Sequence, residues 1–165
     1  MPLLAPRPLA EHHRTESFAS GITSLDDWLK RRALANQSSG ASRTFVVCDE
    51  HRVIGYYALA AGAIRIQDAS GRFRRNMPDP IPVAILARFA VDQAYQGQGI
   101  GRALFRDGAR RVVQAADTLG IRGIVVHAIS EDAKAFYQAL GFDPSPVDAM
   151  TLLVTLSDLR AALPG

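Results

Sequence analysis

The chain has 165 residues, of which 48% are hydrophobic and 21% are charged, with a formal net charge of +3. This composition excludes a disordered chain and predicts a single folded domain over residues 1–165. No apolar run is long enough to cross a bilayer, and residues 1–10 lack the apolar core of a signal peptide. The single cysteine, Cys48, cannot form an internal disulfide, and no His/Cys cluster has metal-ligand spacing. We therefore expect a cytoplasmic protein that uses no metal.

The N-terminal part of the chain predicts one helix and a hairpin. A helix is expected from Asp26 to Ala35, with Ser24 as a candidate N-cap. The small residues of Ser38–Ser42 end it. The apolar runs Thr44–Cys48 and Val53–Ala63 predict two antiparallel strands joined by a tight turn.

The rest of the chain alternates strands and helices. Gln67–Pro82 is expected to be a long connection, and Val83–Val91 predicts a central strand that is apolar except for Arg88. A long helix is expected over Arg102–Leu119, closed by Gly120. The last predicted elements are a strand over 123–129, a helix over 131–140 ended by Gly141, and a strand over 150–156. Together they predict an α+β layered domain with a mixed, mostly antiparallel sheet flanked by helices.

A glycine-rich loop joins the central strand to the long helix. Gly97, Gly99 and Gly101 fall within five residues, directly before a helix N-terminus. Unpaired backbone N–H groups and the helix dipole make such a turn an anion site. A Walker A loop is excluded because no lysine lies here, and a dinucleotide fingerprint read from Gly97 would need glycine at Arg102. The alternative is a turn that only needs flexible residues.

Two motifs in order resemble the GCN5-related N-acetyltransferase (GNAT) family. Gln96-Gly97-Gln98-Gly99-Ile100-Gly101 is similar to the Q/R-x-x-G-x-G/A pyrophosphate loop of that family. Ala133–Phe142 is similar to its A-x-x-F-Y-x-x-x-G-F helix ending. The resemblance covers about residues 44–156 and implies the GNAT acyl-CoA N-acyltransferase fold and acetyl-CoA as co-substrate.

A closer resemblance is to the TacT-like toxins of type II toxin–antitoxin systems, which acetylate aminoacyl-tRNA. The stretches that carry it are Ser24–Leu29, Ser39–Val47, Gly55–Leu59, Arg75–Val83 and His127–Ser130. These stretches are particular to that group and not general to the fold.

The resemblance implies a set of cofactor-binding residues. The pyrophosphate of acetyl-CoA would be held by the backbone N–H groups of Gln96, Gly97, Gln98, Gly99, Ile100 and Gly101, with Arg102 beside them. Ala90 and Val91 would pair with the pantetheine arm as if it were another strand, and Ser130 is a further candidate for a pantetheine contact.

Tyr137 is the implied catalytic residue. When an amine attacks the thioester, coenzyme A leaves as a thiolate, and a phenol near the sulfur can supply a proton. The alternative is a packed core aromatic, as we expect for Phe136. No carboxylate pair forms an obvious base, and Asp92 is expected to cap the loop.

The arginines suggest where a nucleic acid would bind. Of the 19 basic residues only Lys30 and Lys134 are lysines, a bias that suits phosphate binding but that a GC-rich genome would also produce. Candidate tRNA contacts are Arg72, Arg74 and Arg75, with a solvated charged loop as the alternative. Arg88 is either a substrate contact or half of a structural ion pair.

The leading hypothesis is therefore a toxin that moves acetyl from acetyl-CoA to the α-amine of aminoacyl-tRNA and blocks translation. One alternative is a GNAT enzyme that acetylates a small-molecule amine or a protein N-terminus. Another is a module that binds acetyl-CoA without turnover. The resemblance further implies a ribbon-helix-helix antitoxin, a homodimer, and binding of promoter DNA, as a repressor, only by the toxin–antitoxin complex.

Overall fold

The computed structural model describes residues 5–163, and the chain forms two compact units. The first unit combines the N-terminal residues through Ala60 with Ala87–Gly108. The second combines Ala61–Leu86 with the residues from Ala109 onward. Two strands, β3 and β4, and one helix, α4, run from one unit into the other.

The strands form one mixed sheet in the order β1-β2-β3-β4-β5-β7-β6. Their bounds are β1 Arg7–Pro8, β2 Arg43–Asp49, β3 Arg52–Ile64, β4 Ile81–Val91, β5 Gly123–His127, β6 Asp143–Pro144 and β7 Thr151–Thr155. The pair β4–β5 is parallel, and β1–β2, β2–β3, β5–β7 and β6–β7 are antiparallel. The predicted fold class is confirmed.

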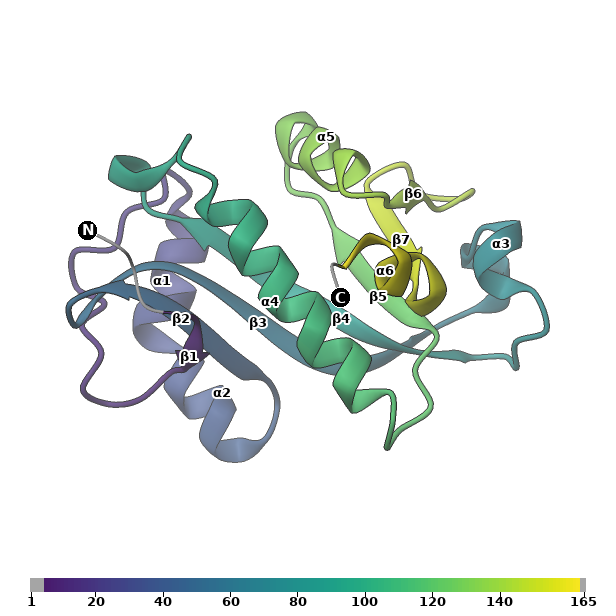
Figure 1. Cartoon of the computed structure of the whole chain (residues 1–165), viewed down its shortest axis with the longest axis horizontal. Coiled ribbons are helices and arrows are strands. Elements are labelled where there is room, and N and C mark those ends of the chain that lie inside the picture. The colour runs from purple at the N-terminus through teal and green to yellow at the C-terminus, as the bar shows by residue number, and fades with distance from the viewer. Residues whose placement is uncertain (1–4, 164–165) are drawn as a thin grey trace. The chain divides into compact units, whose positions relative to one another are not determined.

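Six α-helices are present in the described residues, together with two short 3₁₀ turns, and they are labelled in Figure 1 where there is room. Their bounds are α1 Thr23–Arg31, α2 Ala33–Ser39, α3 Gly71–Arg74, α4 Ile100–Ala115, α5 Glu131–Ala139 and α6 Leu156–Ala162. The 3₁₀ turns η1 and η2 span Ile66–Asp68 and Gln93–Tyr95. None of the helices within residues 5–163 is long and apolar enough to cross a membrane.

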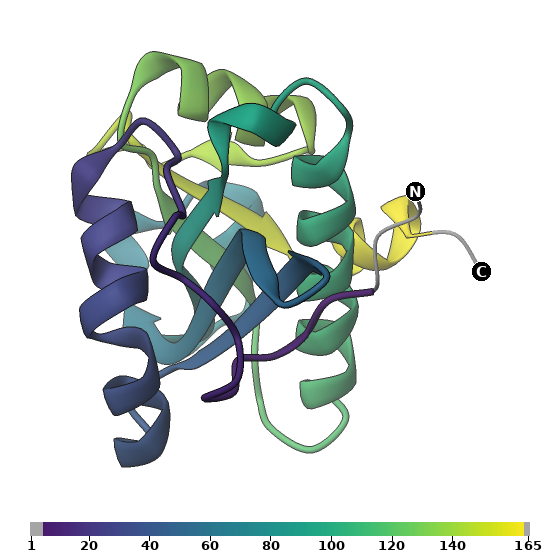
Figure 2. The same ribbon diagram turned by 90° about the vertical axis from the view of Figure 1, so that its left-hand side faces the viewer.

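In the first unit the β2–β3 hairpin separates two sets of helices. Helices α1 and α2 lie on one side of it and the first turns of α4 on the other (Figure 2). Tyr56 of β3 faces α1, since its hydroxyl donates to the Leu25 carbonyl at 2.7 Å. Gly55 faces α4, because a Cβ there would lie 2.9 Å from Leu104. Glycine at position 55 therefore lets α4 approach the strand closely.

The predicted first helix is in fact two helices. The chain leaves helical geometry at Arg32, with φ −121° and ψ −29°, and resumes at Ala33. Ser24 is not the N-cap, because the helix begins at Thr23 and no side chain caps it. Leu25 and Leu29, one turn apart, bury the apolar face of α1 as the pattern predicted.

In the second unit a small apolar core lies beneath α3. Phe73, Ile81, Val83 and Val125 are all at most 3% exposed and pack in one cluster with Leu153. The burial of Phe73 explains why the predicted connection over 67–82 contains helical turns: its apolar side chain draws the segment onto the sheet.

Several boundaries differ from the sequence-based expectation. Helix α4 begins at Ile100 and ends at Ala115, so it includes two residues of the glycine loop and stops short of Leu119. The strands β1 and β6 and the helix α6 were not predicted, because two-residue strands and a terminal helix give weak periodic signals.

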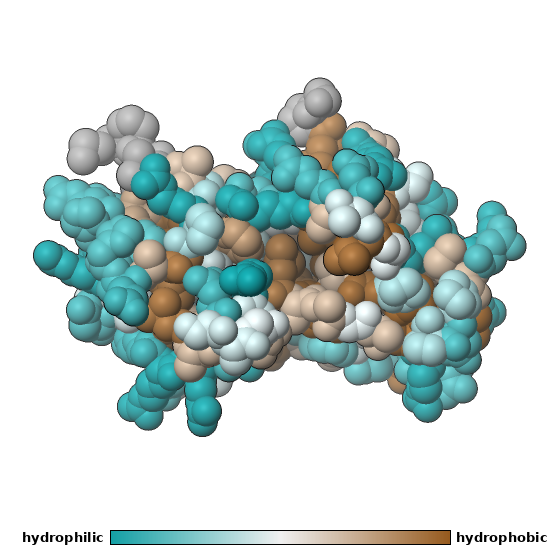
Figure 3. All heavy atoms as spheres, turned by 90° about the horizontal axis from the view of Figure 1, so that it is seen from below, coloured by the Kyte–Doolittle hydropathy of each residue, from teal (hydrophilic) through white to brown (hydrophobic). Residues whose placement is uncertain are grey.

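The surface mixes both kinds of side chain. In Figure 3 hydrophobic residues, in brown, lie between hydrophilic ones, in teal, on the face seen from below. The large apolar side chains that are exposed come from separate elements and loops: Ile22, Leu34, Leu119, Ile129 and Val147. Such isolated residues do not by themselves mark a binding surface.

Candidate active site

The glycine loop has a conformation that its glycines make possible. Gly97 and Gly99 adopt φ angles of +81° and +83°, in the left-handed region that disfavours residues with a Cβ. A Cβ built on either glycine meets no atom within 4 Å. The loop is therefore open on the side where these Cβ atoms would project.

The loop presents a row of backbone donors. None of the N–H groups from Gly97 to Arg102 donates a hydrogen bond to another described residue. The first N–H to find an acceptor within the chain is that of Ala103, which donates to the Gly99 carbonyl at 3.2 Å. These six N–H groups, without an acceptor in the described chain, lie at the positive end of a 16-residue helix, an arrangement that favours a negatively charged ligand.

Asp92 fixes the start of the loop. Its carboxylate is 5% exposed and accepts hydrogen bonds from the N–H groups of Ala19, at 3.1 Å, and Ala94, at 2.9 Å. Its own N–H donates to the Ile54 carbonyl at 2.8 Å. The expected capping role of Asp92 is confirmed, and the structure adds a link to the segment before α1.

Gln96 anchors the loop with its side chain. Its Nε2 donates to the carbonyls of Ser20, at 3.1 Å, and Val91, at 2.8 Å. Its backbone N–H already has an acceptor, the Gln93 carbonyl at 3.4 Å. Gln96 therefore differs from the residues that follow it: it holds the loop in place, while the free N–H groups begin at Gly97.

Tyr95 is a loop anchor that sequence reasoning missed. Its hydroxyl donates to Asp49 at 2.5 Å and accepts from Arg52 at 2.8 Å, both in the β2–β3 turn region. The hydrogen bond to Asp49 raises the pKa of Tyr95. No local pattern predicts this contact, because Tyr95 is more than 40 positions from both Asp49 and Arg52.

Tyr137 is buried in the second unit. It lies on α5, is 6% exposed, and packs edge-on against Phe136 and Phe142, with ring centroids 5.3 and 5.5 Å away. Burial raises the pKa of Tyr137, so its phenol keeps its proton well beyond neutral pH. Gly141, at φ +104°, ends the helix as predicted and turns the chain so that Phe142 can reach the ring.

Two polar residues near α5 have local partners. Ser130 is the N-cap of α5, and its Oγ accepts from the Ala133 N–H at 3.1 Å. His127 is exposed at the end of β5 and bonds Thr151 Oγ1 at 2.9 Å. His127 thus has a hydrogen-bond partner and lies outside the core. The strand ends at His127, so its side chain has already left the packed interior.

The arginines of the predicted tRNA-binding cluster differ in their partners. Arg72 forms a two-point ion pair with Asp158 of α6, at 2.9 and 2.5 Å. This pair lowers the pKa of Asp158. Arg74 and Arg75 are exposed, and neither forms an ion pair with any residue of the described chain. Two of the three guanidinium groups are therefore available to a ligand.

The side chain of Arg122 holds the backbone of α3 in place. Arg122 donates from Nε to the Phe73 carbonyl at 2.7 Å and from Nη2 to the Arg72 carbonyl at 2.8 Å. Its guanidinium also lies 5.9 Å from the centroid of the buried Phe73 ring. These contacts satisfy carbonyls at the end of a very short helix, which has few internal hydrogen bonds.

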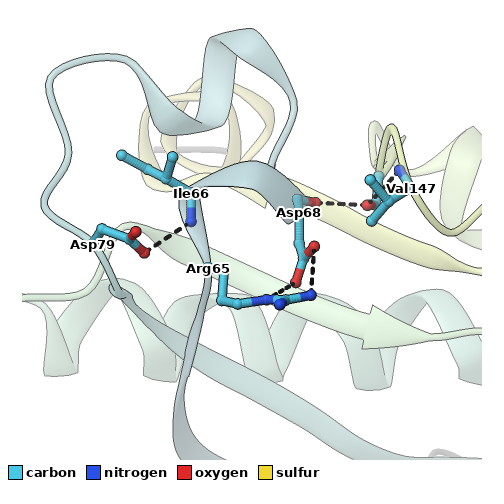
Figure 4. Close-up of polar contacts among 6 residues, drawn as sticks. Arg65, Ile66, Asp68, Asp79 and Val147 are labelled. Carbon is cyan, nitrogen blue, oxygen red and sulfur yellow. Dashed lines mark hydrogen bonds and ion pairs between the residues drawn. The ribbon is translucent and has the colours of Figure 1, made fainter.

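An ion pair and hydrogen bonds also fix the segments on either side of α3 (Figure 4). Arg65 pairs with Asp68 at 3.0 Å, and the Ile66 N–H donates to Asp79 at 3.1 Å. The hydroxyl of Ser145 donates to the Asp68 carbonyl at 2.6 Å. Arg74 and Arg75 therefore project from a fixed segment and not from a free loop.

Arg88 has no ion-pair partner in the described chain. Its guanidinium lies 5.1 Å from the centroid of the Trp28 ring, and its Nη1 donates to the carbonyl of neighbouring Ala87 at 2.8 Å. The structural ion pair that the sequence left open is thus not formed. The glycine loop, Ala90, Val91 and Arg88 belong to the first unit, and Ser130, Tyr137 and α3 belong to the second.

Comparison with known proteins gives a family match and close relatives. The model of the acetyltransferase (GNAT) domain matches residues 40–144. The chain is 50% identical over 159 residues to a tRNA-acetylating toxin of Mycobacterium tuberculosis, covering 96% of each chain. It is 27% identical to a probable toxin TacT of Sinorhizobium fredii, covering 92% of this chain and 90% of the relative.

Solved structures with the same fold include proteins named KacT and AtaT. A tyrosine-to-phenylalanine mutant of KacT superposes with a TM-score of 0.90 at 26% identity, covering 97% of this chain and 99% of that one. AtaT complexed with acetyl-methionyl-tRNAfMet superposes with a TM-score of 0.89 at 26% identity, covering 97% of this chain and 98% of that one. AtaTR bound with acetyl-CoA superposes with a TM-score of 0.82 at 26% identity, covering 95% of this chain and 96% of that one.

Proposed function

The chain belongs to the GNAT acetyltransferase family, and from this premise we propose that it is a type II toxin that acetylates the α-amine of aminoacyl-tRNA. The observation that carries the proposal is the 50% identity, over 96% of both chains, with a tRNA-acetylating toxin. Acetylation removes the nucleophile that forms the peptide bond, so translation stops. Mass spectrometry of total charged tRNA, after incubation with the protein and acetyl-CoA, should find N-acetylated aminoacyl-tRNA. Unmodified tRNA would contradict the proposal.

The glycine loop fits the diphosphate of acetyl-CoA. Six free N–H groups from Gly97 to Arg102, at the N-terminus of α4, can donate to diphosphate oxygens without Cβ atoms in the way. The exposed guanidinium of Arg102 adds positive charge. Ala90 and Val91, at the end of β4, would pair with the pantetheine arm, and Ser130 could still donate its hydroxyl proton while its oxygen caps α5. The bound coenzyme supplies an activated acetyl thioester.

Tyr137 would act as the proton donor. As the amine nitrogen forms its bond to the acetyl carbon, the carbon–sulfur bond breaks and the electron pair stays on sulfur. The phenol of Tyr137 donates a hydrogen bond and then its proton to that sulfur and recovers a proton from water, while the amine proton passes to solvent. A raised pKa keeps Tyr137 protonated and ready for this role.

The amine itself needs little activation. An α-amine has a pKa near 8, so a useful fraction is neutral at physiological pH, whereas a lysine side chain near 10.4 would need a strong base. The first unit offers Asp92 as a buried carboxylate, but both of its oxygens are occupied by N–H groups of the loop and of Ala19. This favours an α-amino substrate over a lysine side chain.

We assign Arg74, the last residue of α3, and Arg75, which follows it, to tRNA phosphates, with Arg72 holding the segment through Asp158. Replacing both with glutamine should weaken the apparent affinity for charged tRNA and lower the steepness of its salt dependence. Each lost phosphate contact reduces the slope of log K against log salt by about 0.7–0.9. The measurement is KM for charged tRNA as a function of KCl concentration.

A matched control uses an arginine elsewhere. The double change Arg31→Gln with Arg43→Gln removes the same charge from exposed positions at the end of α1 and on β2. It should leave the salt slope unchanged. Equal slopes for wild type and the Arg74/Arg75 variant would refute the assignment. A salt-independent KM in the wild type would instead favour a small-molecule amine or a protein N-terminus as the acceptor.

The proposal also includes the protein and DNA partners of a type II toxin. As a type II toxin, the chain would form a homodimer and bind a ribbon-helix-helix antitoxin, and the complex would bind its own promoter DNA as a repressor in the cytoplasm. The similarity to a probable toxin TacT supports this assignment. Co-expression with the product of the adjacent small reading frame should give a stable complex with abolished acetylation. Light scattering on the purified toxin would test the dimer.

A further inference from the structure

The side chain of Arg88 is held between an aromatic ring and a backbone carbonyl, and no residue within 5–163 forms an ion pair with it. It is half-buried, its guanidinium stacks over the Trp28 ring at 5.1 Å, and one N–H is occupied by the Ala87 carbonyl. A guanidinium has five N–H donors, so four have no acceptor among the described residues. A partly desolvated cation without an anion is unfavourable in the free protein.

The platform under Arg88 is rigid. Trp28 lies nearly parallel to the Tyr56 ring, at 9° and 6.0 Å between centroids. Tyr56 is fully buried, with its hydroxyl fixed to the Leu25 carbonyl and Phe18 packed edge-on at 5.5 Å. Because Tyr56 is held by these contacts and Trp28 stacks on it, the guanidinium has a defined orientation in the free protein. This preorganisation lowers the entropy cost of binding.

Among the residues that the structure describes, no carboxylate forms an ion pair with Arg88. Asp26 is the acidic residue that acts electrostatically on Tyr56, together with Arg88. The Asp26 carboxylate accepts instead from the N–H and hydroxyl of Ser20, at 3.0 and 2.6 Å. The positive charge of Arg88 is therefore left for an external anion.

This anion is distinct from the diphosphate of acetyl-CoA. Arg88 and Trp28 lie on the α1 side of the β2–β3 hairpin, where Trp28 packs against the cluster that contains Tyr56 and Ala90. Helix α4, whose N-terminus carries the free N–H groups of the glycine loop, lies on the other side (Figure 2). Arg88 precedes Ala90 by two residues on the same strand, about 7 Å away.

We propose that Arg88, braced by Trp28, binds the phosphate on the 5′ side of the 3′-terminal nucleotide of the aminoacyl-tRNA acceptor. The proposal rests on the proposed function. A phosphodiester offers two oxygens that match the guanidinium fork. A phosphate held beside β4 would set the position of the terminal nucleotide, whose aminoacyl ester carries the attacking amine. Arg88 is thus a positioning residue for the acceptor.

Trp28 provides a direct binding assay, because it is the only tryptophan of the chain. With saturating coenzyme A present to fill the diphosphate site, adenosine 5′-monophosphate should change the fluorescence of Trp28, and adenosine should not. The change should be lost in Arg88→Gln and partly retained in Arg88→Lys. An unchanged response in Arg88→Gln would overturn the proposal.

Kinetics test the same contact during turnover. The two acceptors are 3′-aminoacyl-adenosine with and without a 5′-phosphate. Wild type should favour the phosphorylated acceptor by about 10- to 100-fold in kcat/KM, the range of one charge-assisted contact. Arg88→Gln should abolish this preference and Arg43→Gln should keep it. Equal losses on both acceptors in Arg88→Gln would refute the phosphate contact.

The two proposals fail in different ways. If wild type acetylates neither these acceptors nor charged tRNA, the proposed function is wrong. If wild type acetylates charged tRNA but shows no preference for the 5′-phosphate, only the role of Arg88 is wrong. The fluorescence titration reports on Arg88 in either case, because it needs no turnover.

Discussion

Replacing Tyr137 with phenylalanine should reduce acetylation of charged tRNA by about 100-fold or more, the usual contribution of a positioned proton donor. The change removes only the hydroxyl, so the ring should keep its packing between Phe136 and Phe142. Acetyl-CoA affinity and thermal stability should therefore stay close to wild type. The measurement is single-turnover acetylation with saturating acetyl-CoA.

The pH profile gives an independent check on Tyr137. Burial raises the pKa of this phenol above its ordinary value near 10. The wild-type rate should rise as the substrate amine loses its proton near pH 8 and should not fall again before pH 10. Undiminished acetylation by Tyr137→Phe would refute the assigned role, and a falling limb below pH 10 would show that another group supplies the proton.

Gly99→Ala should weaken acetyl-CoA binding by about 10-fold or more. Alanine at φ +83° is strained by about 1–2 kcal/mol. If the backbone keeps its shape, the new methyl occupies the open side of the loop. If the backbone relaxes, the free N–H groups that follow no longer converge. Calorimetric titration with acetyl-CoA measures the loss.

Gly40→Ala is the matched control for this change. Gly40 has the same φ of +83°, and its Cβ would also meet nothing within 4 Å, but it ends α2. Both variants should lose a similar stability of about 1 kcal/mol, and only Gly99→Ala should lose affinity. Equal acetyl-CoA affinities for the two variants would show that the glycine loop does not bind the coenzyme.

Local patterns predicted the elements that lie closest to the site. The β2–β3 hairpin that the apolar runs predicted, the glycine loop and the Gly141 ending of α5 are all present in the structure. Each depends on neighbours within a few residues, so the sequence carries the whole signal. The break at Arg32 was missed because the apolar pattern continues past it, and only packing of the two helices separates them.

The assignment of side chains to roles was less predictable. Arg72, Arg74 and Arg75 look alike in the sequence, yet only Arg72 meets Asp158, which lies 86 positions away. Gln96 was predicted for its backbone N–H, and its side chain proved to be the anchor of the loop. The contact of Tyr95 with Asp49 and Arg52 also joins distant segments.

The sequence by itself determined the fold class, the glycine loop before α4 and the family resemblance, because these follow from spacing and local backbone preference. Only the tertiary structure decided which charges are neutralised. Whether an arginine is paired depends on where remote carboxylates and aromatic rings lie. In the described residues Arg88 stacks on Trp28 without an ion-pair partner, whereas Arg72 pairs with Asp158. An ion pair needs approach within about 4 Å, which a linear pattern cannot specify.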